Sequence, residues 1–118
     1  MKYLFILNDP PYGTERSYNA LRLARELLKD SIAGNEAKLF LVGDAASCAK
    51  GGQKVPQGYY SIEALLHSVT ARGAEVGVCG TCLDARGLAD AELAKDCGRS
   101  SMAQLATWTA WADKVVVF

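Results

Sequence analysis

The amino-acid sequence predicts an α/β fold: a single three-layer domain spanning residues 1–118, with a central, mostly parallel sheet and helices on both faces. Two observations lead to this prediction. Short apolar runs typical of buried strands alternate along the chain with amphipathic segments, and the connections between successive runs are long enough for crossovers. In addition, 118 residues are enough for one domain and too few for two.

Four apolar runs are predicted to be strands. The first, residues 3–8, is apolar on both faces, which is typical of a central parallel strand covered by helices. It ends at an Asn-Asp-Pro-Pro segment, whose residues favour a loop. The other runs are residues 37–42, 75–79 and the valine-rich 114–118.

Two segments have clear helical periodicity. The first covers residues 14–29, with Thr14 as its N-cap and a stop at Gly34 and Asn35. The second covers residues 61–71, with Ser61 as its N-cap and Gly73 at its C-terminal end. The apolar stripes that identify them are Ala20, Leu21, Ala24, Leu27 and Leu28 in the first and Ile62, Leu65, Leu66 and Val69 in the second.

Three further segments are expected to be helical. Asp44 is expected to cap a short helix that ends at Lys50, and residues 88–96 have a helical composition. Ser100 or Ser101 is expected to cap the last helix. Its inward side chains are expected to be Met102, Leu105, Ala106 and Trp108 or Thr109. Residues 51–59 form one long irregular segment, and loops of this length in compact domains tend to be functional or mobile.

The charge balance argues against several classes of partner. The chain has 13 Lys and Arg residues and 13 Asp and Glu residues, so it lacks the basic excess that nucleic acids and anionic membrane surfaces attract. Its apolar runs are too short to span a bilayer, and its first residues lack the cleavage site of a signal peptide. We therefore expect a cytoplasmic protein whose four cysteines are thiols, not disulfides.

A Cys-x-x-Cys pair, Cys79 and Cys82, stands directly after the third apolar run, and Arg86 follows. In an open α/β sheet, the carboxyl ends of the strands are where ligands bind and reactions occur. A helix starting at this point, together with Arg86, is expected to favour the thiolate, which is the nucleophile in sulfur transfer and disulfide exchange. The alternative is that both cysteines are small buried hydrophobic residues.

Two other readings of the cysteines are weaker. A thioredoxin-like motif belongs near the first strand-helix unit and needs a later proline, but no proline follows Pro56. A structural zinc site needs four ligands, and Cys48, Cys97 and His67 lack paired spacing. We therefore expect no metal site and no cofactor, an exposed His67, and no chemical role for Cys48 or Cys97.

Polar residues after the first strand are expected at the same sheet edge as Cys79. Asn8, Asp9, Tyr12 and Gly13 are candidates for lining a ligand pocket there, although turn formation alone also explains these residue types. In the irregular segment, Lys54 is expected either to bring a cation over the thiolate or to lie on a solvated loop.

Motifs along nearly the whole chain resemble the DsrE/DsrF family, and its small YchN-like branch most of all. The most specific of them is the block from Cys79 to Gly87, in which Arg86 follows the two cysteines. The weaker ones are Asn8-Asp9-Pro10-Pro11-Tyr12-Gly13, Ala20-Leu21-Arg22-Leu23-Ala24, Leu39-Phe40-Leu41 with Asp44-Ala45, Gly52-Gln53-Lys54, Gly58-Tyr59, and Trp108 with Ala112-Asp113-Lys114-Val115.

The resemblance implies a largely parallel α/β sheet and ring-like homo-oligomers, either trimers or hexamers. In the sulfur-relay members of the family, a cysteine at the position of Cys79 carries a persulfide, while Cys82 matches a second cysteine of the YchN-like branch. The expected function is thus sulfur handling, with Cys79, Cys82 and Arg86 as the catalytic set and donor or acceptor proteins as partners. Two alternatives stay open: a non-catalytic oligomeric binding module, and a dithiol redox switch.

Overall fold

The computed structural model describes residues 1–30 and 32–118. Its centre is a five-stranded sheet in the order β4-β3-β2-β1-β5, and every neighbouring pair of strands is parallel. The strands are β1 (Lys2–Leu7), β2 (Glu36–Leu41), β3 (Glu75–Cys79), β4 (Cys97–Ser100) and β5 (Lys114–Val117). The helices are α1 (Arg16–Leu27), the 3-10 helix η1 (Gly43–Ala49), α2 (Ile62–Thr70), α3 (Gly80–Ala85) and α4 (Met102–Trp111).

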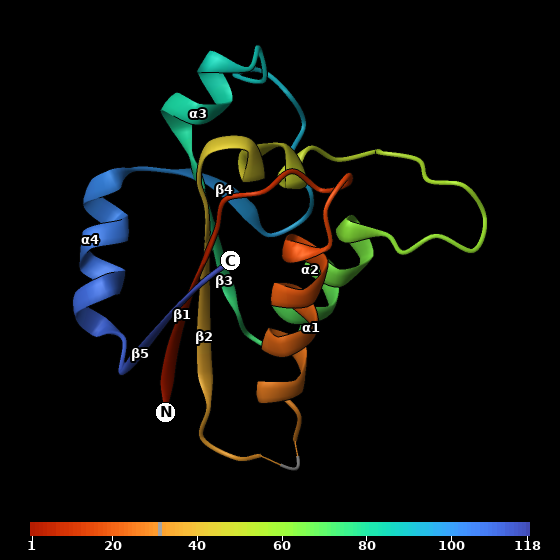
Figure 1. Cartoon of the computed structure of the whole chain (residues 1–118). Helices are drawn as coiled ribbons and strands as arrows, with labels where there is room; N and C mark the ends of the chain where they lie inside the picture. The colour runs from red at the N-terminus through yellow and green to blue at the C-terminus, as the bar shows by residue number, and fades with distance from the viewer. Residues whose placement is uncertain (31) are drawn as a thin grey trace.

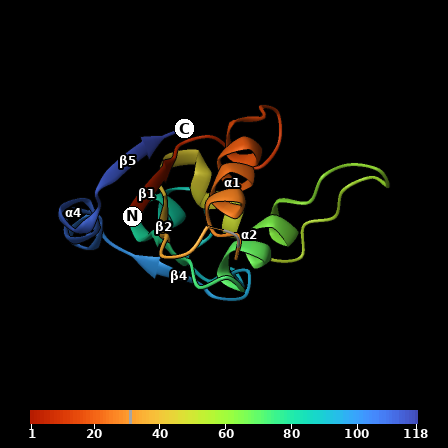
Figure 2. The ribbon, with the colours of Figure 1, turned by 90° about the horizontal axis from the view of Figure 1, so that it is seen from below.

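The sheet has helices on both faces, as the sequence predicts. Helices α1 and α2 lie on one face and α4 lies on the other (Figures 1 and 2). Side chains that alternate along the strands divide the core accordingly. Phe5 and Leu39 belong to the large cluster beneath α1 and α2, while Leu4 and Phe40 pack with Leu105 and Trp108 of α4.

Strand β4 is absent from the sequence prediction. Its residues, Cys-Gly-Arg-Ser, contain no apolar run because β4 is an edge strand and its side chains are at most partly buried. The helix expected at residues 88–96 is wrong: this segment forms turns and an isolated antiparallel bridge between Leu93 and Lys50. The helix that follows β3 is instead α3, which starts directly at Gly80.

Two of the predicted helix caps are confirmed and two are wrong. The hydroxyls of Ser61 and Ser101 each accept a backbone N–H three residues later, at 3.2 Å. Helix α1 has Glu15 as its N-cap, because the Thr14 hydroxyl donates to a carboxylate instead. Asp44 lies inside the first turn of η1, and Val42 holds the cap position.

Only part of the predicted inward face of α4 is buried. Leu105 and Trp108 are buried, but Met102, Ala106 and Thr109 are exposed. Among the described helices, α4 alone packs on this face of the sheet, and it contacts the core through one narrow side. Among the described residues, no helix is long and apolar enough to cross a membrane.

Candidate functional site

The two cysteines of the Cys-x-x-Cys pair lie at the junction of β3 and α3. Cys79 is the last residue of β3 and the N-cap of α3, and Cys82 lies one turn into the helix. Cys79 is only 6% exposed and packs with Leu4, Phe40 and Trp108 on the α4 side of the sheet. The sequence-based placement of Cys79 at the carboxyl end of a strand is therefore confirmed.

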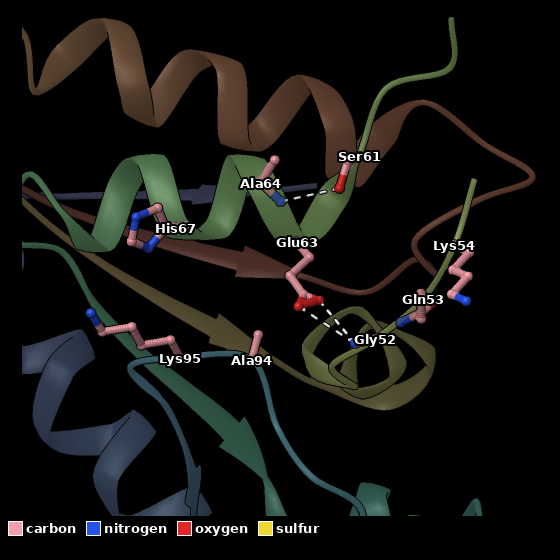
Figure 3. A pocket seen from close by; sticks show the side chains of 9 residues that line it. All are labelled: Gly52, Gln53, Lys54, Ser61, Glu63, Ala64, His67, Ala94 and Lys95. Carbon is pink, nitrogen blue, oxygen red and sulfur yellow. Dashed lines mark hydrogen bonds between the residues drawn. The ribbon is translucent and has the colours of Figure 1, made fainter. Parts of the chain in front are cut away.

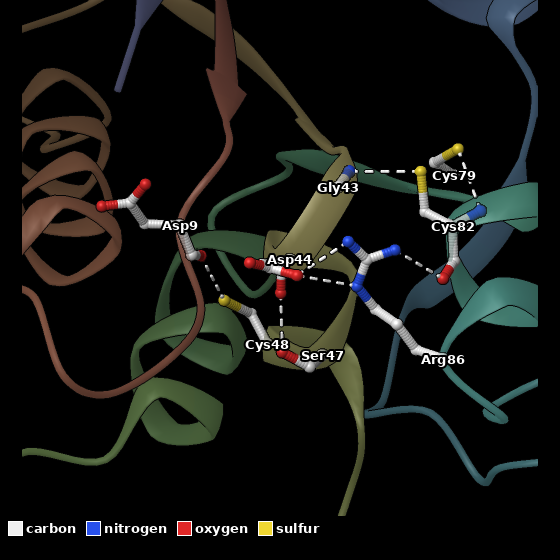
Figure 4. A network of polar contacts seen from close by, with 8 residues as sticks. All are labelled: Asp9, Gly43, Asp44, Ser47, Cys48, Cys79, Cys82 and Arg86. Carbon is white, nitrogen blue, oxygen red and sulfur yellow. Dashed lines mark hydrogen bonds and ion pairs between the residues drawn. The ribbon is translucent and has the colours of Figure 1, made fainter.

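Each sulfur atom accepts at least one hydrogen bond from a backbone N–H group (Figure 4). The Cys79 Sγ accepts the backbone N–H of Cys82 at 3.4 Å and lies 3.3 Å from the Thr81 Oγ1. The backbone N–H of Gly43, at the start of η1, donates to the Cys82 Sγ at 3.2 Å. The pair thus bridges the ends of strands β2 and β3.

The pKa values of the two thiols are shifted in opposite directions. Burial by itself raises the pKa of Cys79, but hydrogen bonds from the Cys82 thiol, the Thr81 side chain and two backbone N–H groups outweigh burial and hold that pKa below its ordinary value. The pKa of Cys82 is raised, first by burial and then by its own hydrogen bond to Cys79. Cys79 is therefore the more acidic thiol of the pair, and Cys82 is the less acidic one.

Arg86 anchors α3 to η1. Its Nε and Nη2 donate to the Asp44 Oδ1 at 2.9 and 2.7 Å, and its Nη1 donates to the Cys82 carbonyl at 3.1 Å. These contacts use the guanidinium on the side of Cys82, away from the Cys79 sulfur (Figure 4). Arg86 is expected from the sequence to help favour the thiolate, and its direct contacts in the structure are with Asp44 and the Cys82 carbonyl, through which it positions the helix that carries Cys82.

The cation beside Cys79 is Arg99, which the sequence analysis misses. On β4, Arg99 is paired in register with Val78, the residue before Cys79. Its guanidinium forms a bidentate ion pair with Asp84, with both N–O distances at 2.8 Å. The pKa of Arg99 is raised by this pair and, to a lesser degree, by the negative charge of Cys79. No sequence signal identifies Arg99, because its strand has no apolar pattern.

Asn8 and Asp9 follow β1 and contact different parts of the chain. The Asn8 side chain donates to the Phe118 carbonyl at 3.1 Å, and the Asn8 backbone carbonyl lies close to Gly43, whose N–H donates to the Cys82 Sγ. The Asp9 carboxylate accepts the Thr14 hydroxyl at 2.8 Å and points away from the two cysteines (Figure 4). Asp9 therefore shapes the entry to α1.

Tyr12, Gly13 and Lys54 lie in other surroundings. The Tyr12 hydroxyl accepts the backbone N–H of Ile62 at 3.1 Å, which joins the loop after β1 to α2. Gly13 has a φ of +103°, a left-handed conformation that suits glycine in the turn before α1. Lys54 lines a separate cavity beside α2. The residues expected in one pocket thus divide between two regions.

The other cysteines are unreactive, and the thiol pair has no metal cluster around it. Burial raises the pKa of Cys48 to about 12 and that of Cys97 to about 12, so neither forms a thiolate near neutral pH. In the part of the chain that the structure describes, no three His, Cys, Asp or Glu side chains gather closely enough to hold a metal ion. The chemistry available at this site is that of two neighbouring thiols, of which Cys79 is the more acidic.

Comparison with known proteins agrees with this geometry. The DsrE/DsrF-like family matches residues 1–118, the whole chain. The chain belongs to the DsrE/DsrF-like family. Within this family it is 37% identical over 117 residues to the protein YchN of Escherichia coli, covering 99% of this chain and 98% of YchN. It is 36% identical over 118 residues to the uncharacterized protein MJ0989 of Methanocaldococcus jannaschii, covering all of both chains.

Solved structures of other proteins share the fold. The crystal structure of the E. coli ychN protein superposes with a TM-score of 0.92 at 36% identity, covering 100% of this chain and 99% of that one. The protein of unknown function MTH1491 from Methanobacterium thermoautotrophicum superposes with a TM-score of 0.78 at 11% identity, covering 99% and 98%. The latter likeness concerns the fold alone. The resemblance to the YchN-like branch is confirmed.

Proposed function

We propose that this DsrE/DsrF-like protein handles sulfur: Cys79 accepts sulfane sulfur as a persulfide and passes it to another thiol. The observation that carries the proposal is the place of Cys79 at the end of β3 and the start of α3, where the Cys82 backbone N–H at 3.4 Å and the Thr81 Oγ1 at 3.3 Å contact its sulfur. These hydrogen bonds hold the pKa of Cys79 below its ordinary value. A thiolate is the nucleophile in transfers of this kind. Membership of a family with sulfur-relay members supports the same reading.

The proposed uptake step needs no oxidant. The Cys79 thiolate attacks the terminal sulfur of a donor persulfide, R–S–SH. An S–S bond forms at Cys79 as the donor S–S bond breaks, and the donor leaves as a thiolate with the electron pair of the broken bond. Delivery repeats the step in the opposite sense: an acceptor thiolate attacks the terminal sulfur, and Cys79 leaves as a thiolate. Its low pKa makes Cys79 a good leaving group.

Cys82 provides a second reaction for the Cys79 persulfide. Once Cys82 has lost its proton to solvent, its sulfur attacks the Cys79 Sγ of the persulfide, hydrosulfide leaves, and a Cys79–Cys82 disulfide forms. A dithiol reductant then restores both thiols. The raised pKa of Cys82 makes this step slow at neutral pH, so the persulfide persists long enough for delivery. In this proposal Arg86 acts by positioning Cys82.

A dithiol redox switch is the second candidate function, and the closeness of the two cysteines favours it, since the Cys82 backbone N–H donates to the Cys79 Sγ at 3.4 Å. An oxidised partner supplies the disulfide: Cys79 attacks it, a partner thiolate leaves, and Cys82 then displaces the remaining partner sulfur. The switch and the carrier share the nucleophile and differ in the product. The product therefore decides between them.

We further propose that the protein works as a homo-oligomer in a reducing compartment such as the cytoplasm, with sulfur-donating and sulfur-accepting proteins as partners. Val115 and Val117, on the α4 side of edge strand β5, are 44% and 63% exposed. Ile6 is paired in register with Val117 and packs against the cluster that contains Cys79. A second copy covering this apolar surface would border the thiols. The trimers and hexamers implied by the family resemblance fit such a contact.

Intact mass spectrometry after incubation with a sulfane-sulfur donor tests the function. The wild-type chain is compared with Cys79→Ser and Cys82→Ser. The carrier predicts a gain of one sulfur atom that disappears in Cys79→Ser and persists in Cys82→Ser. A loss of two hydrogen atoms that requires both cysteines, without any gain of sulfur in Cys82→Ser, supports the switch. An unchanged mass with slow alkylation of Cys79 overturns both and favours a non-catalytic binding module.

A further inference from the structure

A second cavity, of about 540 Å³, lies beside α2, and its lining includes neither Cys79 nor Cys82. It opens between α2, the loop after η1 and the segment that precedes β4 (Figure 3). Its lining includes Gly52, Lys54, Glu63, His67, Ala94 and Lys95. Its volume falls within the range of roughly 300–1,000 Å³ that is common for small-molecule sites.

Hydrogen bonds hold two walls of this cavity in place. The Gln53 amide nitrogen donates to the carbonyls of Ser47 and Lys50 at 2.8 and 3.0 Å, which fixes the start of the loop after η1. The Ala94 backbone N–H donates to the Ala49 carbonyl at 2.7 Å, which ties the opposite segment to the same helix. Because these walls are built by the fold, the cavity does not depend on a ligand to form it.

The cavity has an excess of basic groups. The carboxylate of Glu63 accepts the backbone N–H of Gly52 at 3.0 Å, so it is already engaged at one end. Lys54 and Lys95 take part in none of the ion pairs formed by residues 1–30 and 32–118. Figure 3 shows His67 on α2 and Lys95 across from it on the segment before β4. Two ammonium groups and an imidazole thus border a space that contains one engaged carboxylate.

We propose that this cavity binds a small organic anion, a carboxylate or a phosphate monoester. Its anionic group binds between His67 and Lys95, and its apolar part packs against Ala64 and Ala94. Lys54 adds a second ammonium group at the loop side. Charge-assisted hydrogen bonds from ammonium groups are among the stronger polar contacts in proteins. This assigns Lys54 to an anion site that is separate from the thiols.

His67 makes the proposal directly testable because it is the chain's only histidine. Its ring gives a single set of imidazole resonances, which NMR can follow while the full-length protein is titrated with phenyl phosphate, benzoate or phenol. The double variant Lys54→Gln/Lys95→Gln removes both ammonium groups while retaining side chains of similar size. The control Lys29→Gln/Lys114→Gln removes the same charge from residues that do not line the cavity.

The proposal predicts a saturable shift of the His67 resonances with phenyl phosphate, with benzoate, or with both. Dissociation constants should rise about tenfold or more in Lys54→Gln/Lys95→Gln, because two charged contacts are lost. They should stay within about twofold of wild type in the control, since screening weakens distant surface charges. No saturable shift with either anion overturns the proposal. Equal binding of phenol, or equal weakening in both double variants, also overturns it.

Discussion

The guanidinium of Arg99 lies against Gly80, so closely that a Cβ on Gly80 would fall 2.8 Å from the Arg99 Nε. Gly80 directly follows Cys79, and this close approach is how a cation from the edge strand reaches the thiol site. The ion pair between Arg99 and Asp84 fixes the guanidinium in this place. The absence of a Cβ at position 80 therefore allows the Arg99 guanidinium to lie here.

Gly80→Ala is expected to displace Arg99 and thereby raise the pKa of Cys79. The atoms that the new methyl group meets belong to a flexible, half-exposed side chain, so the Arg99 side chain moves and the backbone stays. The pH at which alkylation of Cys79 is half-maximal should increase, while the melting temperature changes little. Arg99→Gln should also increase the pH of half-maximal Cys79 alkylation. An unchanged alkylation profile in both variants would remove Arg99 from the account.

Thr81→Val should also raise the pKa of Cys79. The substitution keeps the shape of the side chain and removes the hydroxyl that lies 3.3 Å from the Cys79 Sγ. With one fewer donor to the thiolate, the reaction of Cys79 with an alkylating agent should require a higher pH. Thr107→Val, on an exposed position of α4, is the matched control and should leave the profile unchanged. If Thr107→Val shifts the alkylation profile as much as Thr81→Val does, a specific role for the Thr81 hydroxyl is excluded.

Arg86→Gln and Asp44→Asn should show coupled effects on stability. Both side chains retain exposure, at 32% and 65%, so solvent screening limits the interaction to about 0.5–1 kcal/mol. Each single variant should lower the free energy of unfolding in urea by about this amount, and the double variant should lose little more than either one. Fully additive losses would show that the 2.7 Å ion pair does not couple α3 to η1.

Val117→Lys should disrupt self-association. Val117 is 63% exposed on the α4 side of edge strand β5, and a lysine there would bring a charge into an apolar contact. Light scattering coupled to size-exclusion chromatography should show a smaller assembly than for the wild type. Leu23→Lys on α1, at a residue that is 39% exposed, is the control and should leave the mass unchanged. A monomeric wild type would contradict the proposed oligomer outright.

The sequence predicts the parts of the fold that local apolar pattern determines. Residues 75–79 read as a strand because Val76 and Val78 are apolar, and the position of Cys79 at its end follows directly. Strand β4 has no such pattern, and it forms because its backbone pairs with β3. The position of Arg99 beside Cys79 can therefore be recognised only from the structure of the sheet.

The directions of the loops could not be predicted for a similar reason. Lys54 and Cys79 both follow elements at the same edge of the sheet, so a shared pocket is a natural expectation. The path of the loop is instead set by tertiary hydrogen bonds, such as those from Gln53 to the Ser47 and Lys50 carbonyls. No local pattern specifies those partners. The loop carries Lys54 to the α2 cavity, away from the thiols.

Cys79 is the more acidic thiol of the pair, and this difference from Cys82 underlies the proposed function. The most direct test of this difference is the alkylation rate of each cysteine as a function of pH, resolved by peptide mass spectrometry on the reduced wild-type protein. We predict that the Cys79 rate reaches half its maximum at a lower pH than the Cys82 rate, because the pKa of Cys79 is lowered and that of Cys82 is raised. Equal profiles, or a Cys82 that titrates first, would contradict the account.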